Sequence, residues 1–255
     1  ARMSVLIAGC GTAQAARHAL RSPDADVVGI DVSEASLASR LELAERHELR
    51  NLELHRLPVE EASTLARTFD HVVCTGVLHH LADPVEGLHA LRSVMAPGGA
   101  LTLMVYARLG RIGVECLQAY CRLLSISPTL DEVDDLVQVL RELPRGHPIR
   151  PLLEGSADFH DDRAIVDALL NPRERSYSVP ELYQLLDDAG LRFGRWHRQA
   201  PYLPDCGSIA ETPHARRLLE LDPPEQHAAL ELFRGTITRH TVIAHRRDDP
   251  DEQRL

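Results

Sequence analysis

The sequence predicts an α/β fold, a doubly wound and mostly parallel sheet of seven strands with helices on both faces and with helical insertions. Three observations predict it. Within about 106 residues, five apolar runs alternate with segments of helical periodicity, which is typical of repeated strand–helix units. Several helical segments begin at capping residues and end near glycine or proline. A length of 255 residues is sufficient for one such core with insertions.

The first strand leads into a glycine loop. Val5–Ala8 is apolar, Gly9 and Gly11 follow, and an alanine-rich helix should continue to about Arg21. Glycine permits positive φ and close approach of a ligand, and free N–H groups at the helix start favour an anionic or polar group. The third glycine of a dinucleotide fingerprint would fall at Gln14, which disfavours NAD. A purely structural turn is the alternative.

The second strand, Val27–Val32, carries an acid near its end. Asp31 lies 22 positions after Gly9, close to the roughly 20-residue spacing at which such an acid binds ribose hydroxyls. Asp31 could instead cap the next predicted helix, Ser33–Leu49. Ser33 is better placed for that role, which leaves Asp31 for a ligand.

The next part of the chain continues the alternation. Strands are predicted at 51–57, 69–75 and 100–106. A short helix, Glu61–Arg67, should connect the first two of these. Asp83 and Pro84 form a helix start, an N-cap acid followed by proline. Residues 96–99, Ala-Pro-Gly-Gly, read as a turn before the fifth strand.

Beyond residue 107 the pattern changes to helices separated by prolines, at 113–124 and 130–143. After this insertion, Ser178 and Pro180 should start another helix that ends at Gly190. Further elements are strands at 191–197 and 238–246 and helices at about 213–221 and 223–234. We therefore divide the chain into a ligand-binding half (1–107), a helical insertion (108–170), the remainder of the same sheet (171–247) and a charged, frayed tail (248–255).

The composition excludes several classes of partner. The formal net charge of −10 argues against a general nucleic-acid surface, and the apolar segments are too short and interrupted to span a membrane. Five scattered cysteines without a CxxC pair disfavour disulfides and a zinc ribbon, so we expect a cytoplasmic protein. The first strand begins almost at once, without a signal peptide, and further domains could precede it.

Four segments together carry a family resemblance: VLIAGCGT, VVGIDVS, FDHVVCTGVLHHLADP and LRSVMAPGGALTLMVY. In order and spacing they resemble motifs I, II and IV and the post-IV region of class I S-adenosylmethionine (SAM) methyltransferases, over roughly residues 4–106. Three positions differ from the residue types usual in that family. Ile7 replaces an acid, Ala13 replaces a third glycine, and Pro58 stands where an Asp often binds the adenine amino group.

The resemblance implies SAM as the cofactor and a set of residues around it. The set is Ala8, Gly9, Cys10 and Gly11 at the methionine part, Asp31 and Val32 at the ribose, Leu57, Pro58 and Val59 at the adenine, and Thr75, Gly76 and Val77 near the sulfonium. It also implies that the last strand runs antiparallel between strands five and six.

Methyl transfer from a sulfonium is a single in-line displacement, so positioning and desolvation can supply much of the rate without a general base. His79, His80 and Tyr106 are the candidate catalytic residues, because they follow strands four and five at the edge where ligands bind. The alternative is that the histidines shape the loop and the tyrosine packs under the insertion. Acids and a histidine at 158–162 could suggest a metal, but helix capping explains them, and we expect none.

The sequence thus predicts methyl transfer from SAM to O or N of a small organic acceptor, in a pocket roofed by residues 108–170 and about 202–212. A protein or peptide side chain is the alternative acceptor. Two other classes of protein remain open: a non-catalytic SAM-binding module of a longer protein, and a nicotinamide-dependent oxidoreductase, which the missing third glycine disfavours.

Overall fold

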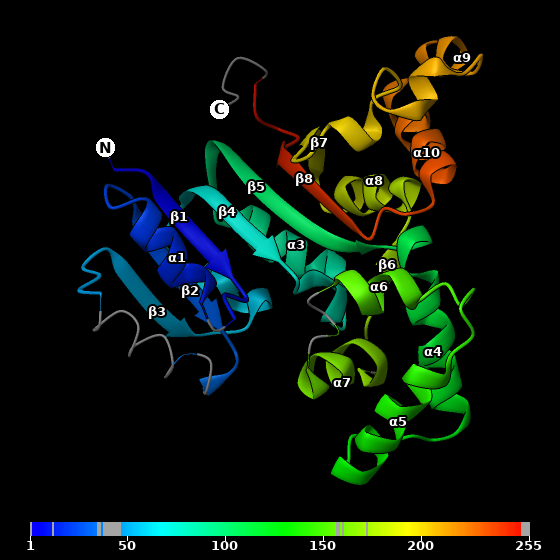
Figure 1. Cartoon of the computed structure of the whole chain (residues 1–255). Coiled ribbons are helices and arrows are strands. Elements are labelled where there is room, and N and C mark those ends of the chain that lie inside the picture. Colours follow the sequence, from blue (N-terminus) through cyan, green and yellow to red (C-terminus); the bar gives the residue numbers. More distant parts are fainter. Residues whose placement is uncertain are drawn as a thin grey trace.

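The structure is a computed structural model that describes residues 2–11, 13–34, 37, 47–156, 159, 161–171 and 173–250. Its sheet has the strand order β3-β2-β1-β4-β5-β8-β7, and a two-residue strand, β6, pairs with β5 (Figure 1). The strands are β1 Ser4–Ala8, β2 Asp26–Asp31, β3 Leu52–Arg56, β4 Phe69–Thr75, β5 Met95–Ala107, β6 Ser176–Tyr177, β7 Leu191–Trp196 and β8 Arg239–Arg246. β8 runs antiparallel to β5 and β7, and the remaining pairs are parallel. The predicted fold class is confirmed.

The helices agree with most of the predicted segments. They are α1 Gln14–Arg21, α3 Pro84–Ser93, α4 Ile112–Leu123, α5 Leu130–Glu142, α6 Arg150–Gly155, α7 Asp162–Leu170, α8 Val179–Asp188, α9 Ala215–Leu219 and α10 Pro223–Arg234. Short 3-10 helices are η1 Val59–Leu65, η2 Leu78–His80, η3 Leu109–Arg111, η5 Ala200–Tyr202 and η6 Ser208–Glu211. The short helix predicted after β3 is thus 3-10 in form and starts two residues earlier. The helix predicted at 33–49 falls mostly outside the described residues.

Capping residues set several helix starts as predicted. The carboxylate of Asp83 accepts hydrogen bonds from the first turn of α3, and Asp161 accepts one from the first turn of α7. Ser178 and Glu181 form a reciprocal capping box at α8. These side chains satisfy N–H groups that a helix leaves without partners, so each start is encoded locally.

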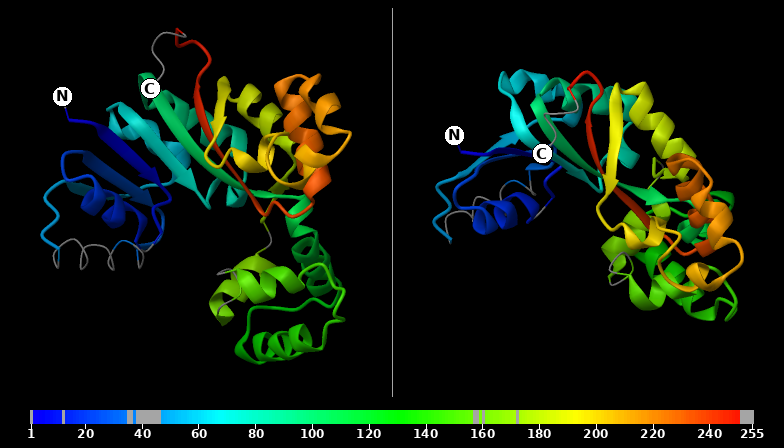
Figure 2. Two further views of the ribbon diagram at one scale, coloured as in Figure 1. Left: turned by 45° about the horizontal axis from the view of Figure 1, so that its top comes forward. Right: turned by 90° about the horizontal axis from the view of Figure 1, so that it is seen from above.

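Helices cover the two faces of the sheet unequally. α1 lies over β1 and β2, where Ile7 and Val27 pack with Ala15 in one core (Figure 1). α3 and α8 lie on the opposite face and bury the main core, which includes Leu6 and Leu103 (Figure 2). On the α1 side, the part of the sheet formed by β4, β5 and β8 borders a cavity instead of a packed helix.

Two details differ from the sequence prediction. Residues 96–99 do not separate α3 from β5 as a turn but lie inside β5, opposite an irregular part of β4. Between two paired positions, Phe69↔Met95 and His71↔Ala100, β4 advances two residues while β5 advances five, so these residues form a bulge. The predicted frayed tail is also wrong at its start, because Asp248 accepts a hydrogen bond from Arg92 and Asp249 is buried.

The insertion forms a helical lobe at the carboxyl end of β5. Its helices α4, α5, α6 and α7 share an apolar core of their own, and the lobe extends away from the sheet in Figure 1 and in the left view of Figure 2. Pattern alone located α4 and α5 to within a residue but did not delimit α6 and α7. In the described part of the chain, no helix combines the length and apolar character needed to cross a membrane.

Candidate cofactor and acceptor sites

Two glycines shape the loop after β1, for different reasons. Both have positive φ, 65° at Gly9 and 51° at Gly11, which disfavours any residue with a Cβ. A Cβ on Gly9 would lie 2.2 Å from a methyl carbon of Val77, so Gly9 also allows the loop after β4 to approach. A Cβ on Gly11 would meet nothing within 4 Å. Gly11 therefore leaves open space above the loop, as a bound cofactor requires.

Asp31 joins this loop to the end of β2. Its Oδ2 accepts a hydrogen bond from the Gly11 N–H at 2.9 Å, and its Oδ1 accepts one from the Ser33 N–H at 2.9 Å. A carboxylate offers about four lone-pair positions, so one acid can accept from backbone N–H groups and from ribose hydroxyls together. The Leu57 N–H donates to the Asp31 carbonyl at 3.1 Å, which brings the loop after β3 to the same place.

The other predicted cofactor residues gather at the same edge of the sheet. The side chains of Ala8 and Cys10 are buried in opposite cores, so only their backbone can meet a ligand. Val59, the first residue of η1, is buried, whereas Val32 is exposed. Gly76, with φ of 77°, follows β4 beside the glycine loop. These residues suit SAM, since they combine open space over Gly11 with one acid at the end of β2 for hydroxyls.

The packing role of a third glycine is taken by other residues. A Cβ on Gly29 of β2 would lie 3.0 Å from the Ala15 Cβ and 3.0 Å from the Cys10 sulfur. Gly29 and Ala15 thus permit the close helix–strand contact that the third glycine of a dinucleotide fingerprint provides. Ala13 at the start of α1 can therefore replace glycine without moving the helix away.

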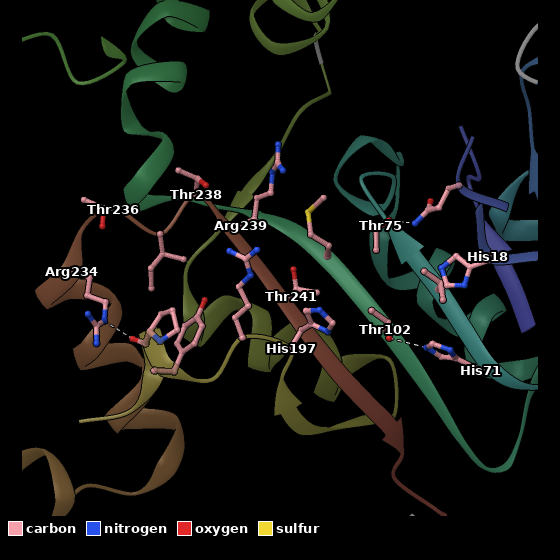
Figure 3. Close-up of a pocket in the computed structure, with 17 residues that line it drawn as sticks. His18, His71, Thr75, Thr102, His197, Arg234, Thr236, Thr238, Arg239 and Thr241 are labelled. Carbon is pink, nitrogen blue, oxygen red and sulfur yellow. Dashed lines mark hydrogen bonds between the residues drawn. The ribbon is translucent and has the colours of Figure 1, made fainter. Parts of the chain in front are cut away.

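A cavity of about 840 Å³ lies on the α1 side of the sheet, beside the carboxyl end of β4 (Figure 3). Its lining residues are Gln14, His18, His71, Val73, Thr75, Thr102, Met104, His197, Arg198, Pro201, Tyr202, Arg234, Thr236, Ile237, Thr238, Arg239 and Thr241. Thr75 is the one predicted cofactor residue among them. Gln14 donates a hydrogen bond to the Thr75 hydroxyl at 2.6 Å, which ties α1 to β4 at this point.

The floor of the cavity is a polar strip across neighbouring strands. His71 and Thr102 are hydrogen bonded at 2.8 Å, and Thr241 lies on β8 beside them (Figure 3). The opposite faces of the same strands carry buried apolar residues such as Val72 and Leu101. Polar residues at alternate positions of strands in an α/β sheet are the sequence signal by which this face can be recognised.

The three candidate catalytic residues lie together, but none is among the residues lining this cavity. His79 is 0% exposed, and its ring lies 4.3 Å from that of His80 and 4.2 Å from that of Tyr106, between centroids. Neither ring nitrogen of His79 has a hydrogen-bond partner among the described residues. Burial, together with the charges of His80, Arg111 and Arg239, lowers the pKa of His79 to about 3. His79 is therefore neutral at ordinary pH.

A buried ion pair adjoins this cluster. The guanidinium carbon of Arg111 lies 3.6 Å from the Tyr106 ring centroid, and Arg111 donates to Glu174 at 2.8 Å. Arg111 is 1% exposed. Gln118 of α4 donates both to Glu174 and to the Ala168 carbonyl of α7. This network connects the end of β5 with the helical lobe and the segment before β6.

The helical lobe lines a second cavity of about 480 Å³ rather than the first one. The two cavities share Thr236, Thr238 and Arg239. Of the segments predicted as a roof, Tyr202 lines the first cavity and residues between 109 and 156 line the second. Asp158 and His160, the remaining metal-like candidates, lie outside the described residues, and the described part contains no cluster of three possible metal ligands.

Comparison with known proteins agrees with this geometry. Residues 6–101, which contain the glycine loop, Asp31 and the end of β4, match the family model described as a methyltransferase domain. This match identifies a methyltransferase domain in residues 6–101 of the chain.

Two curated relatives extend the comparison. An "uncharacterized protein" of Synechococcus is 31% identical over 244 residues, which cover 93% of this chain and 58% of that protein. A ubiquinone biosynthesis O-methyltransferase of Acinetobacter baumannii is 38% identical over 96 residues, 37% of this chain and 40% of the enzyme. The chain thus spans about half the length of the curated relatives it matches.

Solved structures share the fold. PKMT2 from Rickettsia typhi, in complex with AdoHcy, has a TM-score of 0.77 at 16% identity over 98% of this chain and 50% of that chain. A putative sarcosine dimethylglycine methyltransferase from Galdieria sulphuraria has a TM-score of 0.54 at 12% identity, covering 98% and 80%. At these identities the likeness concerns the fold.

Proposed function

We propose that this chain binds SAM at the carboxyl ends of β1, β2 and β4 and transfers its methyl group to O or N of a small organic acceptor held in the 840 Å³ cavity. The observation that carries the proposal is the position of Thr75. It belongs to the wall expected near the sulfonium, and it also lines the cavity. A methyl group and an acceptor atom would meet beside it.

Bound SAM supplies a methyl group on a positively charged sulfur. The residues of the chain hold SAM and the acceptor in position. The open space over Gly11 takes the methionine part of SAM, and Asp31 accepts from the ribose hydroxyls. The Gln14–Thr75 hydrogen bond fixes the wall between cofactor and acceptor. Alignment of the two reactants and exclusion of water then contribute most of the rate.

His79 has a positioning role in this scheme. Its ring is buried and neutral, and its carbonyl accepts a hydrogen bond from the Arg175 N–H at 3.2 Å. It holds the loop after β4 against β5 and the segment before β6. His80 is half-buried and hydrogen bonded to Asn171, and it too lies outside the lining of the cavity.

Calorimetric titration of the purified chain tests the cofactor assignment. SAM and S-adenosylhomocysteine should bind, and Asp31→Ala should weaken both about 10- to 100-fold, as expected for loss of hydrogen bonds to a charged group. Asp26→Ala, at the other end of β2, is the matched control and should bind like the wild type. Binding of NADH alone, or equal affinity in the Asp31 and Asp26 variants, would refute the assignment.

The acceptor class requires its own experiment. Incubation with methyl-labelled SAM and a cell extract, followed by separation by size, should place the label in the low-mass fraction. Label recovered in protein would favour the alternative of a protein or peptide side chain. Absence of label in both fractions, with tight SAM binding, would favour a non-catalytic SAM-binding module.

A further inference from the structure

The charge of the large cavity contrasts with that of the chain. The protein has a formal net charge of −10, yet none of the described residues lining the cavity is Asp or Glu, and three are arginines: Arg198, Arg234 and Arg239. Burial lowers the pKa values of His18 and His71, which favours their neutral forms. The arginines therefore provide the fixed positive charge of this site.

The three arginines are not equivalent. Arg234 donates hydrogen bonds to the carbonyls of Pro201, Ala200 and Cys206, so it holds the segment around η5 in place. Arg198 makes no hydrogen bond or ion pair within the described part of the chain. Arg239 lies on β8 where the two cavities meet (Figure 3).

The second cavity adds an apolar extension. It begins at the residues shared with the first cavity and is lined by Leu109, Ile112, Leu152 and two prolines of the helical lobe, again without Asp or Glu among its described lining residues. A ligand lying across both cavities would have its middle part at Arg239, one end toward Thr75 and the other against this apolar wall.

We propose that the acceptor carries a carboxylate or phosphate bound by Arg198 and Arg239, with an apolar part in the second cavity. This inference rests on the proposed function, because it places the reactive end of the acceptor at Thr75. Arginine suits the task since its planar guanidinium binds either anion through paired hydrogen bonds. The net negative charge of the protein repels an anion from most of its surface. A cavity that contains arginines and no Asp or Glu among its described lining residues is therefore the favoured place for that anion to bind.

The test uses amphipathic probes of equal chain length: octanoate, octyl phosphate and uncharged octanamide, titrated by calorimetry into the chain saturated with S-adenosylhomocysteine. At least one anion should bind more tightly than octanamide. The stronger of octanoate and octyl phosphate identifies the anion. Arg198→Ala and Arg239→Ala should each weaken that binding about tenfold or more and leave octanamide unchanged.

Arg216→Ala on α9 is the matched control, since this exposed arginine lines neither cavity. Thermal unfolding of each variant checks that the fold persists. The proposal is overturned if neither anion binds the wild type at millimolar concentration, if octanamide binds equally well, or if the Arg198 and Arg239 variants behave like Arg216→Ala. Failure to bind S-adenosylhomocysteine would instead refute the proposed function, and the two failures are thus separable.

Discussion

Replacing His79 by Gln should flatten the dependence of stability on pH between 7 and 5. Burial first, then the neighbouring charge of His80, lowers the pKa of His79 in the folded protein to about 3. In the unfolded chain the pKa returns to about 6.5. Between these values the unfolded state binds a proton that the folded state does not, so the free energy of unfolding falls as the pH falls.

The magnitude follows from proton linkage. With a folded pKa near 3 and an unfolded pKa near 6.5, His79 removes about 2 kcal/mol of stability between pH 7 and pH 5, approaching about 1.4 kcal/mol per pH unit at the lower end. Glutamine cannot take up that proton. The loss of stability from pH 7 to pH 5 should therefore be about 2 kcal/mol smaller in His79→Gln than in the wild type.

Urea unfolding at pH 7 and at pH 5 gives the free energy of unfolding of each variant at both pH values. Comparing the change between the two pH values removes any pH-independent cost of the substitution. His89→Gln is the control for the substitution itself, because His89 is exposed on α3. The NMR signal of the His79 ring in the wild type should also stay constant down to pH 5. Equal pH dependence in His79→Gln and wild type, or titration of that ring signal near pH 6, would refute the assignment of a buried neutral ring.

Two further predictions concern the glycine loop and the buried ion pair. Gly9→Ala should lower thermal stability more than Gly11→Ala, because both incur roughly 1–2 kcal/mol for positive φ but only Gly9 also meets Val77. Equal melting temperatures would contradict that contact. Arg111→Met should lower the free energy of unfolding by about 3–5 kcal/mol, because it leaves the Glu174 carboxylate buried without its cation. The double variant with Glu174→Leu should recover most of this loss, as measured by urea unfolding. No recovery would mean that the two residues do not act as a pair.

Local signals accounted for the parts of the fold that depend on neighbours in sequence. Asp83 and Ser178 could be identified as caps because a helix start needs an acceptor within the next three residues. Asp31 could be paired with Gly9 through the fixed length of a strand–helix–strand unit. The family resemblance added the position of the last strand between β5 and β7, and this position is confirmed.

The acceptor cavity could not be predicted in the same way. Arg239 and Thr241 are far from His71 in sequence and line the same cavity as His71 only because β8 inserts next to β5. Alternation along a strand shows that its two faces differ, but it does not show which face a helix covers. Arg198 lies in the loop after β7, where no sequence pattern marks it as part of a site. The residues that we propose for the cofactor therefore carry local sequence signals, whereas those that we propose for the acceptor are brought together by the order of the strands.

The bulge at residues 96–99 decides which residues face that cavity. Phe69 and Met95 both enter the main core, although His71, only two positions after Phe69, faces the cavity. Successive alternate residues of a regular strand share one face, so the irregular pairing must change the facing of β4 at this point. Thr102 then stands beside His71 on the cavity side, and Leu101 stays in the core. If the bulge were one residue shorter, either the cavity-facing residues or the core residues of these strands would turn to the opposite face of the sheet. The Pro-Gly-Gly segment therefore positions the proposed acceptor site, although it is not among the residues that line the cavity.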